Sequence, residues 1–228
     1  KTTMYCAVPT VLVMMQPDFG TAFVFICIMV FIYFIGRISW GYILTAAGGL
    51  AVCMPLAYYF VLSDSQRERI DVFINPESDL QNSGYNVAQS KIAIGSGQLT
   101  GKGFFSEGTL AQLRFVPERH TDFIFAGIVE GLGFVGGTII ICLFFALIFR
   151  WIYIAMRTKD SFGTCLVVGV AGMFTAHVFE NIGMTIGLMP VTGIPLPFIS
   201  YGGSNLLTNL IGVGIVENVW MRRQSKKR

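Results

Sequence analysis

The sequence predicts an all-α polytopic membrane protein with about six transmembrane segments and one long extracytoplasmic loop. Hydrophobic residues make up 54% of the 228 residues and charged residues only 13%. Soluble domains carry about 25% charged residues, so this composition is that of a membrane protein. The apolar runs approach the roughly 20 residues of a bilayer-spanning helix, and they lack the alternation of barrel strands.

Three apolar segments come first. Residues 5–15 are short for a span and contain Pro9. A turn, Gln16-Pro-Asp-Phe-Gly20, leads into residues 19–35, which are apolar throughout and predict a spanning helix. Residues 40–62 predict the next span.

Residues 63–121 are polar and form the predicted extracytoplasmic loop, which is too long for a simple connector and is therefore a candidate functional region. Residues 123–149, 162–188 and 199–221 complete the set of predicted spans. We predict a single membrane domain over residues 1–228. Because the chain opens at Lys1 without an initiator Met, we expect it to be part of a longer protein.

The distribution of basic residues predicts the orientation. A cytoplasmic carboxyl terminus leaves ten of the 16 Lys and Arg residues inside: Lys1, Arg37, Arg150, Arg157, Lys159, Arg222, Arg223, Lys226, Lys227 and Arg228. The other six lie in the long loop, where the positive-inside rule is weakest. All three Trp residues lie near an inside arginine, as an interfacial aromatic belt requires. The long loop is therefore expected to face outward.

Four ionisable residues crowd the end of this loop, immediately before the apolar run that starts at residue 123: Glu118, Arg119, His120 and Asp122. Thr121 is expected to be the N-cap of the following helix. Asp122 would then lie in the first turn, where the positive end of a helix favours a carboxylate. A functional site and a simple capped helix that enters the bilayer both fit this pattern.

Polar residues also recur inside the predicted spans, and three of them define a candidate cavity: Glu130, His177 and Glu180. Glu130 follows Asp122 by eight residues, or roughly 12 Å along a helix. Charges at such depth mark either a functional cavity or partners that glue helices together. For Asn205 and Asn209 we favour the second interpretation, with hydrogen bonds between helices.

Glycine-rich stretches of the loop surround two lysines, Lys91 and Lys102. These stretches are suited to binding an anionic diphosphate, but a solvated loop explains them nearly as well. Residues 193–204 carry two prolines and end in Gly-Gly-Ser204, which we expect to line the same outer cavity. The five cysteines show no metal-ligand spacing. A net charge of +3 without a basic stripe does not indicate nucleic-acid binding.

Several stretches together resemble the signatures of the SEDS family of cell-wall proteins, whose members include RodA, FtsW and SpoVE. They are Gln16-Pro-Asp-Phe-Gly-Thr21, Gln89-Ser-Lys-Ile-Ala-Ile-Gly-Ser-Gly97, Gly101-Lys-Gly103, Pro117-Glu-Arg-His-Thr-Asp-Phe123 and Ser200-Tyr-Gly-Gly-Ser204. Arg119, and Arg69-Ile70 followed by residues 73–76, resemble RodA more than FtsW. The family has ten spans, so its amino-terminal spans are expected to lie outside this chain.

The resemblance implies a peptidoglycan glycosyltransferase that polymerises lipid II into glycan strands at the outer face of the bacterial cytoplasmic membrane, for cell elongation and rod shape. It implies that Asp122 is catalytic, as the general base on the acceptor sugar. Lys91, Lys102 and Arg119 would stabilise the leaving diphosphate. Glu118, His120 and Ser204 would shape the substrate site.

The resemblance further implies a partner, a class B penicillin-binding protein, and a multi-pass protein with a cytoplasmic carboxyl terminus. A divalent cation, Mg²⁺ or Mn²⁺, is compatible with the diphosphate chemistry, but the sequence shows no dedicated ligand set. Two alternatives stay open. One is a lipid II flippase or transporter, favoured by the charges inside the spans. The other is a non-catalytic scaffold for the penicillin-binding protein.

Overall fold

The computed structural model of the chain describes residues 2–16, 18–35, 41, 48, 58–59, 62, 64–75, 79, 83–103 and 120–225. Within these ranges every regular element is a helix, as the sequence predicts. The helices are α1 (Thr2–Met14), α2 (Phe19–Ile35), α4 (Asp64–Ile74), α5 (Ser83–Ser96), α6 (Ile124–Arg157), α7 (Ser161–Thr185) and α8 (Gly203–Ser225).

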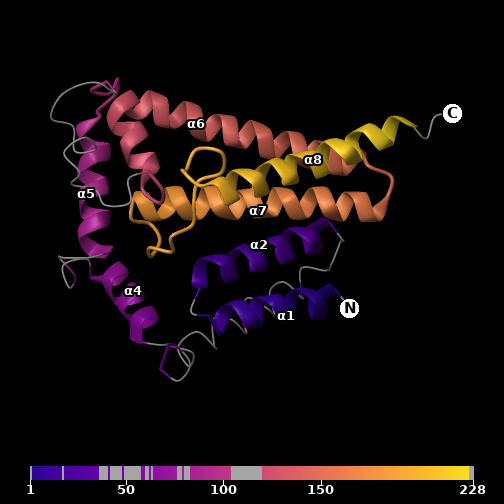
Figure 1. Cartoon of the computed structure of the whole chain (residues 1–228), viewed down its shortest axis with the longest axis horizontal. Coiled ribbons are helices and arrows are strands. Elements are labelled where there is room, and N and C mark those ends of the chain that lie inside the picture. Colours follow the sequence, from indigo (N-terminus) through magenta and orange to yellow (C-terminus); the bar gives the residue numbers. More distant parts are fainter. Residues whose placement is uncertain are drawn as a thin grey trace.

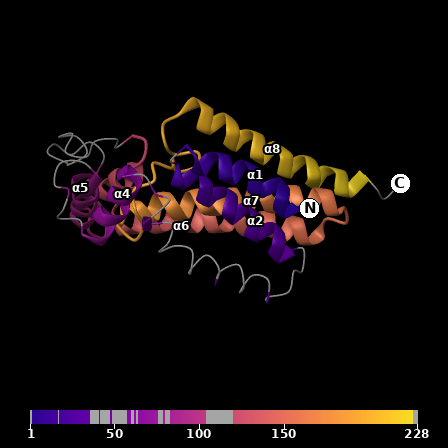
Figure 2. The same cartoon turned by 90° about the horizontal axis from the view of Figure 1, so that it is seen from below.

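The long helices form a bundle with α7 at its centre. Helix α7 packs against α2, α6 and α8, and α1 packs against α2. Successive helices α6, α7 and α8 run in alternating directions (Figure 1). Helices α4 and α5 lie across one end of the bundle, opposite the carboxyl terminus (Figures 1 and 2). The bundle therefore has one end covered by α4 and α5 and another that carries the chain's carboxyl terminus.

An aromatic core joins α6, α7 and α8. Trp151 of α6 and Phe174 of α7 meet edge to face, with ring centroids 4.7 Å apart. Val216 of α8 is fully buried in the same cluster. Such an aromatic pair contributes about 0.5–1.5 kcal/mol beyond its buried area, so this contact helps to stabilise α6 against α7.

The predicted spans can be compared with the helices directly. Residues 19–35 are predicted as a helix and form α2 with the same bounds. Among the described residues, only α6 and α7 are long and apolar enough to cross a bilayer by length and composition, and α2 is a shorter apolar helix. The predicted span of residues 40–62 lies mostly outside the described residues. The count of about six spans stays a prediction.

The long loop is more ordered than its polarity indicates. We predicted residues 63–121 as a polar loop, but they contain α4 and α5. Ser90 and Ala93 of α5, and Gly97 directly after it, are buried and recur at helical spacing, so this segment packs through a narrow face of small residues. Small residues carry little hydropathy, which is why the apolar pattern does not reveal this helix.

Candidate functional site

Asp122 lies in the turn that precedes α6. We predicted that Thr121 caps the helix and that Asp122 occupies the first turn. That prediction is wrong, because Phe123 is the N-cap residue and α6 begins at Ile124. The Phe123 side chain is buried, and the carbonyl groups just before it bind other segments. These contacts hold Asp122 outside the helix.

Three successive carbonyl oxygens of this turn accept hydrogen bonds from α7 and from the α7–α8 loop (residues 186–202). The pairs are Tyr201 N to His120 O at 2.9 Å, Ser200 Oγ to Thr121 O at 2.6 Å, and Asn181 Nδ2 to Asp122 O at 2.9 Å. Asn181 is fully buried, and its Nδ2 also donates to Ile194 O at 2.8 Å. The backbone of Asp122 is therefore fixed while its side chain stays half-buried.

Gly193 brings the α7–α8 loop next to the carboxylate of Asp122. A Cβ atom built at Gly193 would lie 3.5 Å from Asp122 Oδ2. Gly193 has φ of 76°, in the left-handed region that favours glycine. The carboxylate therefore faces backbone rather than a side chain at this point.

The turn of residues 196–200 supports the same arrangement. Ser200 Oγ accepts a hydrogen bond from Leu196 N at 2.8 Å while it donates to Thr121. Phe198 has φ of 61°, which is unusual and strained for a bulky side chain. Its ring packs on Phe174 at a centroid distance of 5.4 Å. Packing against the core thus holds an irregular turn beside the candidate site.

The amino-terminal turn of α2 packs against the loop from the other side. Asp18 caps α2, since its Oδ1 accepts from Thr21 N at 3.0 Å and its Oδ2 from Thr21 Oγ1 at 2.6 Å. A Cβ atom at Gly20 would lie 2.7 Å from Ile194 Cγ1 and 2.9 Å from Thr192 Cβ. The Asp-Phe-Gly-Thr motif therefore sets how closely α2 approaches the loop.

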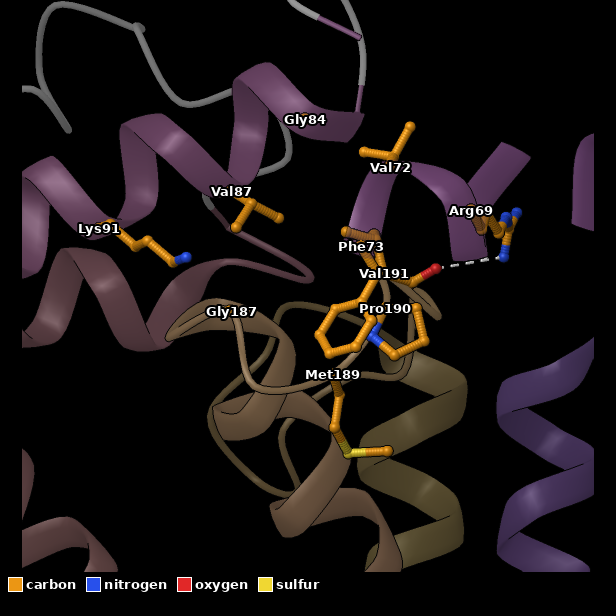
Figure 3. Close-up of a pocket in the computed structure, with 10 residues that line it drawn as sticks. All are labelled: Arg69, Val72, Phe73, Gly84, Val87, Lys91, Gly187, Met189, Pro190 and Val191. Atoms are coloured by element: carbon orange, nitrogen blue, oxygen red, sulfur yellow. Dashed lines mark hydrogen bonds between the residues drawn. The ribbon is translucent and has the colours of Figure 1, made fainter. Parts of the chain in front are cut away.

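Two cations flank the start of the α7–α8 loop (Figure 3). Lys91 of α5 lies against Gly187, which has φ of 75° and closes the carboxyl end of α7. Arg69 of α4 donates through Nη1 to Val191 O at 3.4 Å. A pocket lies between the helices and the loop, lined by Arg69, Val72, Phe73, Gly84, Val87, Lys91, Gly187, Met189, Pro190 and Val191.

Arg69 is a site candidate that sequence reasoning missed. The sequence gives no reason to place it near Asp122, because 53 residues of chain separate the two. The structure brings them to one loop, with Arg69 at Val191 and Asp122 at Gly193. The available signal was its place in Arg69-Ile70, which, with residues 73–76, resembles RodA.

Lys102 and Glu130 lie beside each other. Lys102 Nζ is 3.7 Å from Glu130 Oε1, and Ser96 Oγ donates to the same oxygen at 3.4 Å. Glu130 was expected well inside the bundle, on the assumption of a straight helix. Helix α6 instead breaks at Gly133, and its first turns cross the end of the bundle (Figure 1). Glu130 therefore lies at the covered end of the bundle, beside Ser96 and Lys102.

The other two cavity candidates lie elsewhere. Glu180 is fully buried on α7, close enough to Asp18 to interact with it electrostatically. The side chain of Thr192 lies beside the Glu180 carboxylate, whereas His177 Nδ1 is buried without a hydrogen-bond partner among the described residues. Glu180 therefore faces the α2 side of the bundle, whereas Glu130 faces Lys102 in the segment after α5. The structure does not bring the three residues into one cluster.

The remaining candidates are placed as follows. Asn209 Nδ2 donates to Asn205 Oδ1 at 3.0 Å within α8, so this bond lies inside one helix rather than between helices. His120 is exposed, and Ser204 is exposed in the first turn of α8. Glu118 and Arg119 lie outside the described residues. Among the described residues, no three His, Cys, Asp or Glu side chains are grouped as a metal site requires, and the role of a divalent cation stays an expectation.

Comparison with known proteins follows from this geometry. An all-helical bundle with long apolar helices among its described residues is the architecture of a polytopic membrane protein. Residues 1–225 match the family of cell cycle proteins formed by FtsW, RodA and SpoVE. The chain belongs to this family, as the sequence signatures predict.

Curated relatives agree. The chain is 44% identical to the peptidoglycan glycosyltransferase MrdB of Escherichia coli, over 95% of this chain and 58% of the relative. It is 42% identical to the stage V sporulation protein E of Bacillus subtilis, over 91% of this chain and 56% of that protein. The chain thus spans somewhat more than half the length of these relatives.

Solved structures show the same fold. One is a chain from a peptidoglycan synthase complex that coordinates polymerization and crosslinking, with a TM-score of 0.79, 30% identity, and coverage of 97% of this chain and 61% of that chain. The other is a mutant of the rod shape determining protein RodA of Thermus thermophilus, with a TM-score of 0.64, 25% identity, and coverage of 97% and 56%. The all-α membrane fold predicted from the sequence is confirmed.

Proposed function

We propose that this chain carries the catalytic part of a peptidoglycan glycosyltransferase, which polymerises lipid II at the outer face of the bacterial cytoplasmic membrane during cell elongation. The observation that carries the proposal is the fixed backbone of Asp122, whose half-buried carboxylate adjoins Gly193 at the covered end of the bundle. The names of the relatives support the reaction class.

Asp122 is the general base in this proposal. Its carboxylate takes the proton of the 4-hydroxyl of the acceptor sugar as that oxygen bonds to the anomeric carbon of the donor. The bond from the anomeric carbon to the diphosphate breaks, and undecaprenyl diphosphate leaves with the electron pair. A general base contributes about 10²–10⁴-fold to such a step. The three hydrogen bonds to the backbone supply the orientation that the step requires.

The leaving diphosphate needs positive charge nearby. Arg69 and Lys91 contact the α7–α8 loop at Val191 and Gly187, and Asp122 adjoins the same loop at Gly193. The two cations are therefore the candidates on this loop for binding the diphosphate. Lys102 and Arg119 stay further candidates for this role.

The orientation in the membrane has support from the opposite end of the bundle. Arg150 lies over the Trp220 ring at 4.9 Å, and Arg157 over the Tyr153 ring at 5.2 Å. Arginines paired with aromatic rings suit the cytoplasmic interface. Helices α4 and α5 would then face the outer side (Figure 1). A class B penicillin-binding protein on that side is the proposed partner.

Lipid II polymerisation tests the proposal. The assay uses this segment within a family-length chain, together with the transpeptidase partner whose own active site is disabled. Wild-type protein should form glycan strands, and Asp122→Asn should lower the rate by at least roughly 100-fold. Asp160→Asn is the matched control, because Asp160 caps α7 at the opposite end of the bundle. Equal rates from Asp122→Asn and wild type would contradict the catalytic role.

The flippase alternative has one observation in its favour, the fully buried carboxylate of Glu180 inside the bundle. It predicts that lipid II crosses vesicle membranes without being joined. It also predicts that Glu180→Gln stops this transport while Asp122→Asn does not. Measuring transport and polymerisation in the same vesicles separates the two functions.

A further inference from the structure

A turn of the outer loop is inserted into a break of helix α6. The break lies at Gly133, whose φ of 72° and ψ of −172° are not helical. In an unbroken helix, the N–H groups of Phe134 and Val135 would donate to the carbonyl groups of Glu130 and Gly131. Here all four of these groups bond to the inserted turn, which we define as residues 97–103.

The exchange of partners is complete on both sides of the break. Phe134 N donates to Gln98 O at 2.8 Å, and Val135 N to Leu99 O at 3.2 Å. Glu130 O accepts from Lys102 N at 3.0 Å, and Gly131 O from Gly103 N at 2.9 Å. Two bonds within a helix are thus replaced by four bonds between segments. The inserted turn and the break therefore require each other.

Glycines make the insertion sterically feasible. A Cβ atom at Gly97 would collide with Val129 O, and one at Gly101 would collide with Gly131 O. Because these neighbours are backbone atoms, they have no rotamer through which to move aside. Gly101 and Gly133 also have positive φ. The glycines therefore let the inserted turn approach α6 more closely than residues with a Cβ atom would allow.

Side chains complete the contact. The Glu130 carboxylate is buried, whereas Lys102 is partly exposed, with Nζ 3.7 Å from Oε1 of Glu130. A buried carboxylate needs such partners, because leaving it unpaired is strongly unfavourable. Glu130 thus binds Lys102 twice, through its side chain and through its carbonyl group.

We propose that Glu130, Lys102 and the inserted turn position Asp122 by setting the bend of α6. The bend directs the first turns of α6 across the end of the bundle (Figure 1), and Asp122 lies at their start. When the turn leaves, the N–H groups of Phe134 and Val135 return to Glu130 and Gly131. Helix α6 then straightens, and Asp122 moves away from Gly193. The effect on activity rests on the proposed function. The change of hydrogen-bond partners between α6 and the inserted turn does not depend on it.

Amide hydrogen exchange at single-residue resolution tests this change of hydrogen-bond partners. Gly97→Ala should block insertion. The amides of Lys102 and Gly103 should then lose protection, while those of Phe134 and Val135 stay protected within a continuous helix. Gly95→Ala, near the end of α5 and two residues before Gly97, is the matched control, since nothing lies within 4 Å of a Cβ atom there. Unchanged protection of all four amides in Gly97→Ala, or loss of all four, would overturn the proposal.

Polymerisation kinetics test the positioning role in the same family-length chain. Glu130→Gln should lower kcat by roughly tenfold or more, because small misplacement of a catalytic group is costly, and the lipid II KM should change little. Lys102→Met should act on kcat in the same way, and the double variant should be no worse than either single variant. A raised KM in Lys102→Met alone, with additive effects, would overturn the pairing and indicate a substrate contact. If wild-type protein forms no glycan strands, the proposed function is contradicted. Amide hydrogen exchange then still tests whether the inserted turn sets the bend of α6.

Discussion

The side-chain amide of Asn181 holds the main-chain carbonyl of Asp122 at 2.9 Å and that of Ile194 at 2.8 Å. One buried side chain on α7 therefore ties the turn before α6 to the loop before α8. Both segments lack regular structure, so neither could fix the other through a helix or a sheet. This amide is one of the three donors that hold the turn of Asp122, and the one that binds the carbonyl group of Asp122 itself.

Asn181→Leu should lower kcat for lipid II polymerisation, because a side chain of similar size cannot donate to the two carbonyl groups. Leaving buried acceptors unsatisfied costs about 1–3 kcal/mol, so thermal stability in detergent should also fall. Asn218→Leu, at an exposed position on α8, is the matched control. Retained activity in Asn181→Leu would contradict the role of this amide in positioning Asp122.

Gly193→Ala should also lower the polymerisation rate. A left-handed backbone costs an alanine about 1–2 kcal/mol, and the new methyl group would lie beside Asp122 Oδ2. A loss of about tenfold is expected from strain of this size if it displaces the loop in the active state. Gly203→Ala serves for comparison, because nothing lies within 4 Å of a Cβ atom there. Equal rates for the two variants would show that the loop tolerates a side chain next to the base.

Arg69→Ala should raise the lipid II KM by about tenfold, since a charge-assisted contact to phosphate contributes roughly 1.5–3 kcal/mol. Arg69→Lys should recover only part of this loss, because lysine lacks the planar fork of arginine. Lys159→Ala removes a charge between α6 and α7, at the opposite end of the bundle, and serves as the comparison. Steady-state kinetics over a range of lipid II concentrations distinguish a KM effect from a kcat effect. An unchanged KM in Arg69→Ala would remove Arg69 from the diphosphate site.

Ser200→Ala should lower kcat more than Ser204→Ala does. Ser200 Oγ both donates to Thr121 O and accepts from Leu196 N, whereas the Ser204 side chain is exposed. Each lost hydrogen bond is worth about 0.5–1.5 kcal/mol, so Ser200→Ala should cost roughly tenfold. Ser204 was predicted to contact substrate, and that role would appear as a raised KM. A larger loss of kcat in Ser204→Ala would reverse the assignment.

Hydropathy predicted the parts of the fold that face lipid or core. The bounds of α2 follow from the sequence because every residue from Phe19 to Ile35 is small or apolar. The break in α6 could not be predicted in this way. Gly131 and Gly133 resemble packing glycines of a spanning helix, and only the inserted turn explains the positive φ of Gly133.

The sequence names the candidate site residues, but it does not show how the fold arranges them. The signature around Asp122 points to the carboxylate through family resemblance. The hydrogen bonds that hold it run to carbonyl groups, which every residue type carries, so no sequence pattern marks them. Asn181 was visible only as a polar residue next to Glu180. Arg69 and Asp122 contact the same loop, at Val191 and Gly193, and the path of that loop depends on tertiary packing.

The ring of Phe174 touches Trp151 on one side and Phe198 on the other. Phe198 lies two residues before Ser200, which bonds to the carbonyl group of Thr121. A line of aromatic rings thus leads from the interior of the bundle to the residue next to Asp122. We expect a shift of α6 against α7 to reach the covered end of the bundle through these rings. The thickness of the surrounding bilayer should then influence the position of the carboxylate.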